Sequence, residues 1–365
     1  MRRRTFMISL PALAVAGVGA PLVARANPDL SCGQAIITGF RGTRPSDPEV
    51  DLVRRLLEAG RIAGVILLKR NIRSPEQLTQ LAACLKGSCV DVPPIIAIDQ
   101  EGGAVSRLGR ATGFADWKAA AELVAEEPTD SAILAYYGTR AGELAAAGIN
   151  LNLGPVVDLN INPFNPIIGT LGRSYSRQEE VVIRFASLFV QAHRSARVKT
   201  CLKHFPGHGS AHSDSHLDLP DVSVTWTPAE LTPFQRLVEH GLADAIMTAH
   251  LTHPTFSELP WMPASLSART VQKIRDDLKF DGPIFTDDMQ MGAISSLLDG
   301  PSSAAVAAVQ AGNSFLIYSN YRRSDSIQTA EIATAAIREA LTDGRLDAAK
   351  VAGQLDQARQ FRATL

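Results

Sequence analysis

The stretch "PPIIAIDQ" (residues 93–100) joins an unbroken apolar run to a polar end. Such runs are typical of buried parallel strands, because helices cover both faces of a parallel sheet. Seven other stretches have the same form: "AIITGF" (35–40), "AGVILLKRN" (63–71), "INLNLGPVVDLN" (149–160), "VKTCLKHF" (198–205), "ADAIMTAH" (243–250), "GPIFTDDM" (282–289) and "NSFLIYSN" (313–320). Amphipathic stretches lie between the runs, and Asp47-Pro48 and Ser176 are good helix starts. The sequence therefore predicts eight strand–helix units.

Eight such units predict a single (β/α)8 barrel of the TIM type with inserted loops. Nearly every run ends in polar residues: Arg70 and Asn71, Asp99 to Glu101, Asp158, Lys203 and His204, His250, Asp287 and Asp288, and Ser319 and Asn320. In a barrel these ends meet at one rim, where catalytic groups collect. A doubly wound open sheet, or two sheet domains, is the alternative and would spread them along an edge. The pattern favours an enzyme.

The first residues have the features of an export signal rather than of the fold. Residues 1–26 combine a positive start, an apolar run and an Ala24-x-Ala26 ending, and Arg3-Arg4 fits the twin-arginine variety. Cleavage after Ala26 would leave 365 − 26 = 339 residues, so residues 27–365 are expected to form the catalytic barrel. A periplasmic or exported location follows. An uncleaved single membrane anchor and a cytoplasmic location are the alternatives.

Charge and composition exclude several classes of function. The chain carries a net charge of −1, which becomes −1 − 4 = −5 when the four arginines of the signal are removed. A mildly acidic domain without a Lys/Arg block is a poor match for nucleic acid. Of the four cysteines, Cys84 and Cys89 form the most plausible bridge, with buried free thiols as the alternative. No Cys-x-x-Cys occurs, so a thiolate zinc site is not expected.

The stretch "KHFPGHGSAHSDSHLDLP" (203–220) places four histidines four residues apart. They are His204, His208, His212 and His216. On a helix this spacing would align the imidazoles as metal ligands, but Pro206, Gly207 and Gly209 favour a loop. The regular spacing is therefore interpreted as a coincidence on a loop. A zinc site of irregular geometry is the alternative.

Two carboxylates and one histidine carry the chemistry that the loop and the seventh run suggest. Asp214 can hydrogen-bond His216 and fix its tautomer, so that the imidazole gives and takes a proton near neutral pH. A solvated loop is the alternative. Asp287 and Asp288 end a strand, so only one of them faces the barrel axis, and the apolar run does not settle which. A carboxylate that faces a pocket, together with a mobile acid/base, is the smallest set of groups that retaining glycoside hydrolysis requires. The alternative is that Asp287 and Asp288 cap a helix or brace a loop.

At these residues the chain resembles a known family. "KHFPGHG" followed by "DSH" and "LP", with "FTDD" downstream, is similar to the bacterial β-N-acetylglucosaminidases of glycoside hydrolase family 3. "GVILLKRNI", "AIDQEGGAVSRL", "GPVVDLN", "GRSYS" and "TAH" occur in the family order, and "KHFPGHG…DSH" separates this branch from the family's β-glucosidases, which take their acid/base from a second domain. Ser314 departs from the pattern, which has an acid there.

The resemblance implies a two-step retaining mechanism without a metal or an organic cofactor. It implies that Asp287 is the nucleophile and that His216 is the acid/base, with Asp214 as its partner. It also implies a set of sugar-holding residues: Asp99, Arg107, Arg173, Lys203 and His204.

The resemblance further implies a substrate, with alternatives for both the substrate and the mode of action. We expect an exo-β-N-acetylglucosaminidase that acts, as a monomer, on peptidoglycan fragments or other glycans containing N-acetylglucosamine. Chitooligosaccharides are an alternative substrate. Participation of the substrate's acetamido group, a catalytically silent sugar-binding barrel, and phosphorolysis in place of hydrolysis are alternative modes of action.

Overall fold

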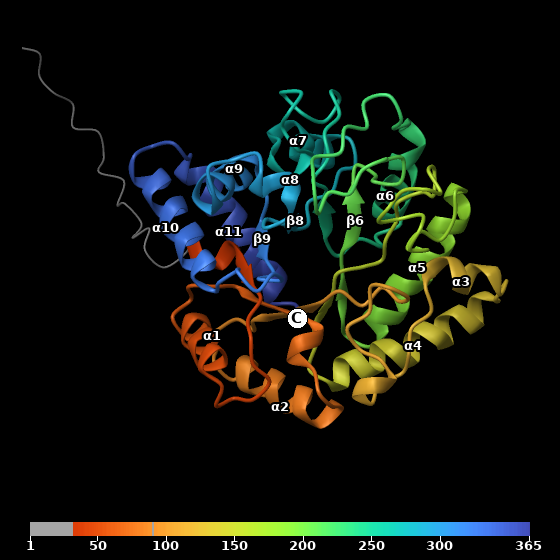
Figure 1. The fold of residues 1–365 in the computed structure, drawn as a ribbon, viewed down its shortest axis with the longest axis horizontal. Coiled ribbons are helices and arrows are strands. Elements are labelled where there is room, and N and C mark those ends of the chain that lie inside the picture. Colours follow the sequence, from red (N-terminus) through yellow and green to blue (C-terminus); the bar gives the residue numbers. More distant parts are fainter. Residues whose placement is uncertain (1–31, 90) are drawn as a thin grey trace, which may run out of the picture.

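The computed structural model describes residues 32–89 and 91–365 (Figure 1). The predicted export signal, residues 1–26, lies outside this part of the chain. Among the described residues, no helix has both the length and the apolar character needed to span a membrane.

The strands form one parallel sheet that closes into a barrel. They are β1 (Ile36–Thr38), β2 (Gly64–Leu67), β3 (Ile95–Ile98), β4 (Leu151–Asn152), β5 (Lys199–Thr200), β6 (Leu202–Phe205), β7 (Ile246–Thr248), β8 (Ile284–Asp288) and β9 (Phe315–Tyr318). Their order is β5-β4-β3-β2-β1-β9-β8-β7-β6. The end strands β5 and β6 are consecutive in the chain, and a parallel bridge between Val156 and Lys203 joins the remaining gap. The predicted (β/α)8 barrel is confirmed, and the open-sheet alternative is wrong.

All eight apolar runs become strands, but one of them becomes two. The run 198–205 is divided at Cys201, whose N–H donates to the carbonyl of Gly154 (2.8 Å). The first part of the run pairs with β4, and the second pairs with β7. The chain thus changes partners within one run, which gives nine strands where eight were expected.

Helices surround the barrel (Figure 1). They are α1 (Pro48–Glu58), α2 (Pro75–Lys86), α3 (Ala120–Ala125), α4 (Asp130–Ala146), α5 (Glu179–Ser195), α6 (Thr232–Glu239), α7 (Ala268–Asp276), α8 (Gly292–Ser295), α9 (Pro301–Ala311), α10 (Gln328–Thr342) and α11 (Ala348–Arg362). Short 3-10 turns occupy Cys32–Ala35, Lys69–Asn71, Arg110–Thr112, Pro228–Leu231 and Ala264–Leu266. The start of α1 after Asp47 is as predicted, whereas α5 begins three residues after Ser176.

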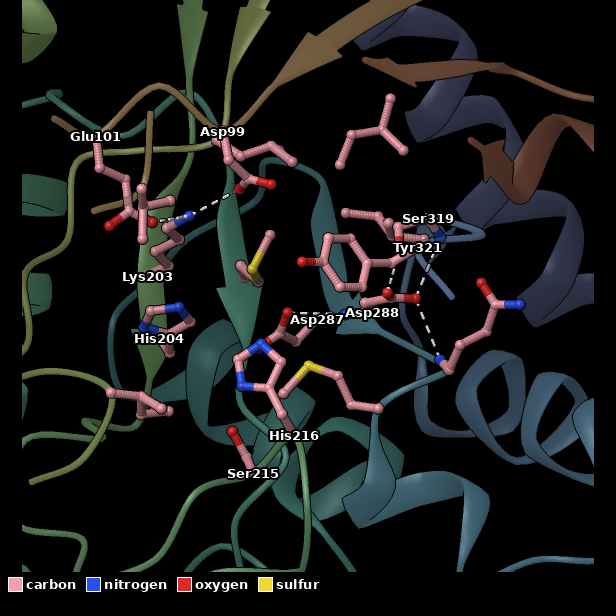
Figure 2. A pocket seen from close by; sticks show the side chains of 18 of the residues that line it. Asp99, Glu101, Lys203, His204, Ser215, His216, Asp287, Asp288, Ser319 and Tyr321 are labelled. Carbon is pink, nitrogen blue, oxygen red and sulfur yellow. Dashed lines mark hydrogen bonds and ion pairs between the residues drawn. The ribbon is translucent and has the colours of Figure 1, made fainter. Parts of the chain in front are cut away.

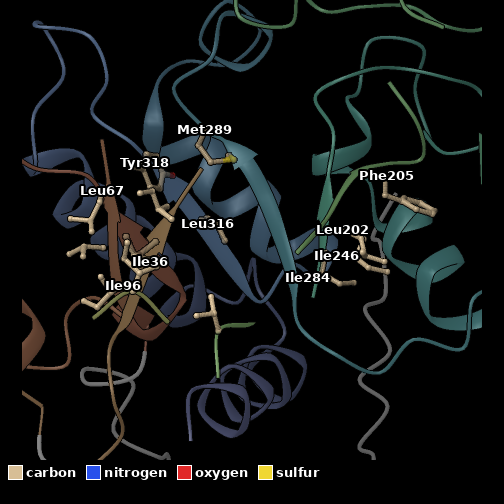
Figure 3. Packing of buried hydrophobic residues seen from close by; sticks show 14 of the residues in the cluster. Ile36, Leu67, Ile96, Leu202, Phe205, Ile246, Ile284, Met289, Leu316 and Tyr318 are labelled. Atoms are coloured by element: carbon tan, nitrogen blue, oxygen red, sulfur yellow. The ribbon is translucent and has the colours of Figure 1, made fainter. Parts of the chain in front are cut away.

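The side chains of each strand divide between two apolar layers. Figure 3 shows the layer between strands and helices, which includes Ile246 and Ile284. The intervening residues, among them Met247 and Phe285, form a separate cluster inside the barrel. Phe361 of α11 belongs to this inner cluster, and its ring centroid lies 6.1 Å from that of Phe285. The inner cluster fills the barrel below the catalytic rim.

The structure shows the surroundings of two positions that the sequence singled out, the Cys84–Cys89 pair and Ser314. The Cys84–Cys89 bridge is wrong: both thiols are free, and the Cys89 sulfur lies 3.6 Å from the carbonyl oxygen of Leu57. Ser314, where the resemblance led us to expect an acid, braces the sheet. Its hydroxyl donates to Gln357 of α11 (2.7 Å) and accepts the N–H of Ile284 (3.2 Å).

Candidate active site

A cavity of about 430 Å³ opens at the ends of the strands. Its floor includes Leu153, Met247 and Ile317, which belong to the inner barrel cluster. Its walls carry charged side chains from β6, from the end of β8 and from the residues that follow β3 (Figure 2). The polar ends of the predicted runs therefore meet in one pocket, as expected for a barrel enzyme.

One wall is a compact charge network around Lys203. The Lys203 ammonium lies 3.0 Å from an oxygen of Asp99 and 2.6 Å from one of Glu101. Arg173 binds Glu101 through two nitrogens, at 2.7 and 2.9 Å, and Arg107 donates to Asp99 at 3.2 Å. Burial alone would raise the pKa of Glu101, but Arg173 and Lys203 hold it well below its usual range. These charges stay fixed at neutral pH and present rigid donors and acceptors to the pocket.

A second network orients His204. Asp158 is fully buried, and its carboxylate lies 2.6 Å from Nδ1 of His204 while accepting the backbone N–H groups of His204 (3.1 Å) and His208 (2.8 Å). Burial lowers the pKa of His208 to about 4 despite the attraction of Asp158, so its ring is neutral at pH 7. Nε2 of His204 lies 3.4 Å from Arg173, which links the two networks.

Asp287 and Asp288 face different surroundings. Asp287 follows the inward-facing Phe285 by two residues, so it shares the inner face of β8 and lines the cavity. Burial would raise the pKa of Asp287, but the charges of His204 and His250 lower it to about 2. Asp288 accepts hydrogen bonds from the Ser319 N–H and hydroxyl, and burial raises its pKa to about 6. The strand phase, which the sequence left open, thus gives one ionised carboxylate at the axis and one bracing carboxyl group beside it.

The loop after β6 brings a histidine to the same cavity. Nδ1 of His216 lies 2.8 Å from Asp214, which also accepts the His216 N–H at 2.8 Å. His216 lines the cavity and is exposed, whereas Asp214 stands behind it and does not line the cavity. Figure 2 shows His216 next to Asp287, and we name residues 214–217 the flap. The flap rests on α8, since the N–H of Gly292 donates to the carbonyl of His216 (3.0 Å).

We expect Gly292→Ala to misplace the flap. A Cβ on Gly292 would lie 2.6 Å from the carbonyl oxygens of both His216 and Leu217, closer than real Cβ atoms approach. The flap must therefore shift away, and His216 with it, so kcat for an N-acetyl-β-glucosaminide should fall roughly tenfold, since misplacement by about 1 Å is costly. Gly353→Ala on α11, where a Cβ meets nothing within 4 Å, is the matched control. Equal kcat values for the two variants would contradict this role of Gly292.

We expect Glu230 to make stability fall as pH rises. Glu230 is fully buried behind the loop that leads to the flap, and burial, followed by the nearby Asp158, raises its pKa to about 7 from 4.5. The folded state therefore holds a proton that the unfolded state releases, so stability is lost as pH rises from about 4.5 to about 7. Glu230→Gln should stabilise the protein by about 2 kcal/mol at pH ~8 and much less at pH ~5. Thermal unfolding at both pH values tests this, and an equal shift in Tm at both would contradict it.

The structure brings together all but one of the predicted site residues around the cavity. They are Asp99, Arg107, Arg173, Lys203, His204, His216 and Asp287, with Asp214 behind His216. Sequence reasoning missed Glu101 and Asp158 as site residues, although both stand at the polar ends of predicted strands. Glu101 stands two residues after Asp99, and Asp158 directly follows the apolar pair Val156-Val157, and these positions were the available signal.

The four histidines that are spaced four residues apart each contact a different partner. His204 pairs with Asp158, His208 lies 3.3 Å from Ser215, His212 lies 3.1 Å from Asn162, and His216 pairs with Asp214. No helix runs through residues 204–216. Among the described residues, no group of three or more His, Cys, Asp or Glu side chains is arranged to hold a metal ion.

Comparisons with known proteins agree with this geometry. Residues 44–358 match the model of the glycosyl hydrolase family 3 N-terminal domain. A Pseudomonas aeruginosa protein named beta-hexosaminidase is 33% identical over 290 residues, which cover 78% of this chain and 82% of that protein.

Two solved structures share the fold. A glycoside hydrolase family 3 beta-N-acetylglucosaminidase from Paenibacillus sp. aligns with a TM-score of 0.82 and 33% identity over 92% of this chain. That chain is longer, and the present one spans 62% of it. A beta-N-acetylhexosaminidase from Beutenbergia cavernae aligns with a TM-score of 0.79 and 27% identity, covering 93% of this chain and 98% of the other.

A parallel barrel with an ionised carboxylate and a histidine at its rim, together with these matches, defines the class of protein. The chain is a glycoside hydrolase. It belongs to glycoside hydrolase family 3, because the family model covers most of its length.

Proposed function

We propose that this hydrolase is a β-hexosaminidase that removes terminal β-linked N-acetylglucosamine with retention of configuration. The observation that carries the proposal is the arrangement in the cavity: Asp287 is ionised at the barrel axis, and His216, held by Asp214, lines the same cavity from the flap. The names of the related proteins from Pseudomonas, Paenibacillus and Beutenbergia support the hexosaminidase activity.

The proposed reaction has two steps. In the first, an oxygen of Asp287 bonds to the anomeric carbon, the glycosidic bond breaks, and the leaving oxygen takes the proton of His216. In the second, His216 removes a proton from water, whose oxygen attacks the anomeric carbon and releases Asp287. Asp214 fixes the ring through Nδ1, so Nε2 is the nitrogen that carries the transferred proton.

A histidine in place of a second carboxylate has an electrostatic rationale. Two carboxylates close together repel each other, and one of them takes up a proton. A neutral or cationic imidazole beside Asp287 avoids this, and the charge of His216 contributes to the lowered pKa of Asp287.

The charge network supplies the contacts that hold the sugar. Asp99 accepts hydroxyl protons, while Lys203 and Arg107 donate to sugar oxygens in a pocket where an unpaired polar group is costly. Arg173 and His204 both interact electrostatically with Asp287, and we assign them to the part of the pocket next to the anomeric carbon. The carboxylates and cations neutralise one another before the sugar binds, so the wall is formed in advance.

We propose peptidoglycan fragments as the substrate and the periplasm as the location. The twin-arginine-like segment supports export, and a cavity of about 430 Å³ has room for a terminal sugar. Cell fractionation of the wild-type protein and of a variant with Arg3 and Arg4 replaced by Lys tests the location. Chitooligosaccharides are the competing substrate, and relative kcat/KM values for the two glycans decide between them.

The activity itself is tested with two chromogenic substrates. We expect hydrolysis of para-nitrophenyl N-acetyl-β-glucosaminide to be much faster than hydrolysis of the matching β-glucoside. Retention is checked by following the anomer first released with NMR. A preference for the glucoside, or release of the opposite anomer, would overturn the proposal.

A further inference from the structure

The loop after β9 (residues 319–325) is held in place by two arginines from neighbouring strand ends. Arg70 donates to the carbonyls of Ser319 (3.0 Å) and Tyr321 (3.4 Å). Arg41 donates to the carbonyls of Asp325, Arg322 and Arg323 at 3.1, 2.9 and 3.1 Å. These five guanidinium contacts to main-chain carbonyls help to fix the path of the loop, whose residues 321–324 are exposed.

This loop presents an aromatic ring and a cation to the cavity. Tyr321 is 73% exposed and lines the cavity, and Figure 2 shows its ring near Asp288 and Ser319, across from Lys203. Arg322 also lines the cavity, and its Nη2 lies 3.5 Å from the carbonyl oxygen of His216. Within residues 32–89 and 91–365, no carboxylate lies within ion-pair distance of the Arg322 guanidinium.

The contact with His216 tells which part of a substrate would meet Arg322. The acid/base must reach the glycosidic oxygen, so the leaving group lies on the side of the flap, and the cleaved sugar lies on the side of the Lys203 network. Arg322 touches the backbone of the acid/base, whereas the partners of Asp99 are Lys203 and Arg107. Leu217 of the flap, 76% exposed and also lining the cavity, offers an apolar surface on the same side.

Resting on the proposed function, we propose that Tyr321, Arg322 and Leu217 form the subsite for the leaving group, and that Arg322 selects leaving groups that carry a carboxylate. Tyr321 and Leu217 contact the apolar face of the leaving sugar. The Arg322 guanidinium has donors left over from its single contact with His216, and its fork matches a carboxylate. Because Arg322 also touches the flap, an anion bound there holds His216 over the bond to be broken.

The test compares one substrate in two charge states. The β-linked disaccharide of N-acetylglucosamine and N-acetylmuramic acid carries a carboxylate on its leaving sugar, and its methyl ester lacks that charge. We expect the ratio of kcat/KM for the acid to kcat/KM for the ester to fall about fivefold in Arg322→Ala, the effect of one exposed charge-assisted contact. Arg322→Lys should keep part of the ratio, and added salt should lower it in the wild type.

Arg323→Ala is the matched control, because Arg323 is the neighbouring exposed arginine and does not line the cavity. Its ratio should equal that of the wild type. The same ratio in Arg322→Ala and wild type would overturn the selection by Arg322 while leaving the hexosaminidase activity intact. Hydrolysis of neither disaccharide by the wild type would instead overturn the proposed function and this inference with it.

Discussion

Asp287→Ala is expected to reduce kcat for para-nitrophenyl N-acetyl-β-glucosaminide by roughly 10⁴- to 10⁶-fold, because the variant loses the carboxylate that we propose forms the glycosyl intermediate. The physical basis is the inner face of β8, which directs Asp287 into the cavity, and the nearby histidines that lower its pKa to about 2. In the proposed mechanism, an ionised, partly desolvated carboxylate at this point both attacks the anomeric carbon and stabilises its developing positive charge.

Two further measurements separate this role from a structural one. Added azide should restore turnover to Asp287→Ala and yield the glycosyl azide of inverted configuration, because the small anion fills the space of the lost carboxylate. Asp288→Ala is the control: it loses its bonds to Ser319 and Gln290, and azide should not rescue it. A fluorinated-sugar trap should leave a stable adduct on Asp287. Its absence, with the acetamido group required for turnover, would point to participation by the substrate instead.

The fold could be predicted because its signal is local. Each apolar run with a polar end becomes a strand, and the polar ends meet at one rim, as expected for a barrel. The division of the run 198–205 could not be predicted, because it depends on the Cys201 N–H turning to the carbonyl of Gly154, which lies beyond the end of β4. The expected Cys84–Cys89 bridge was wrong for a related reason: short spacing in the sequence does not tell where two thiols point.

For the site, too, the sequence pattern predicts some features, whereas others depend on how the chain packs. The carboxylate that faces the axis could not be chosen from "IFTDD", because both faces of β8 are apolar. Glu101 was missed because its partner Arg173 is 72 residues away, and the two meet only where the loops after the paired strands β3 and β4 come together. The approach of the flap to Gly292 is likewise invisible in the sequence, since nothing marks a glycine as the place where another backbone must fit.

His216→Ala is expected to lower kcat/KM by about 10²- to 10⁴-fold for substrates with a poor leaving group and far less for an activated aryl leaving group. The reason is that a sugar oxygen must be protonated as the bond breaks, whereas dinitrophenolate leaves without help. The pH profile should also lose the limb that the acid/base controls. Asp214→Asn should reproduce part of the loss, because Asp214 holds the His216 ring through Nδ1 and the backbone N–H.

His212→Ala is the matched control for this prediction. His212 lies on the same loop, is exposed, and contacts Asn162 rather than the cavity, so its loss should leave the leaving-group dependence unchanged. If His216→Ala lowered the rates of all substrates by one common factor, with an unaltered pH profile, His216 would be a structural part of the flap. The proton donor would then have to be sought among the other groups of the cavity. His204, which is paired with Asp158 and lines the cavity, would be the first candidate, whereas burial keeps the ring of His208 neutral at pH 7.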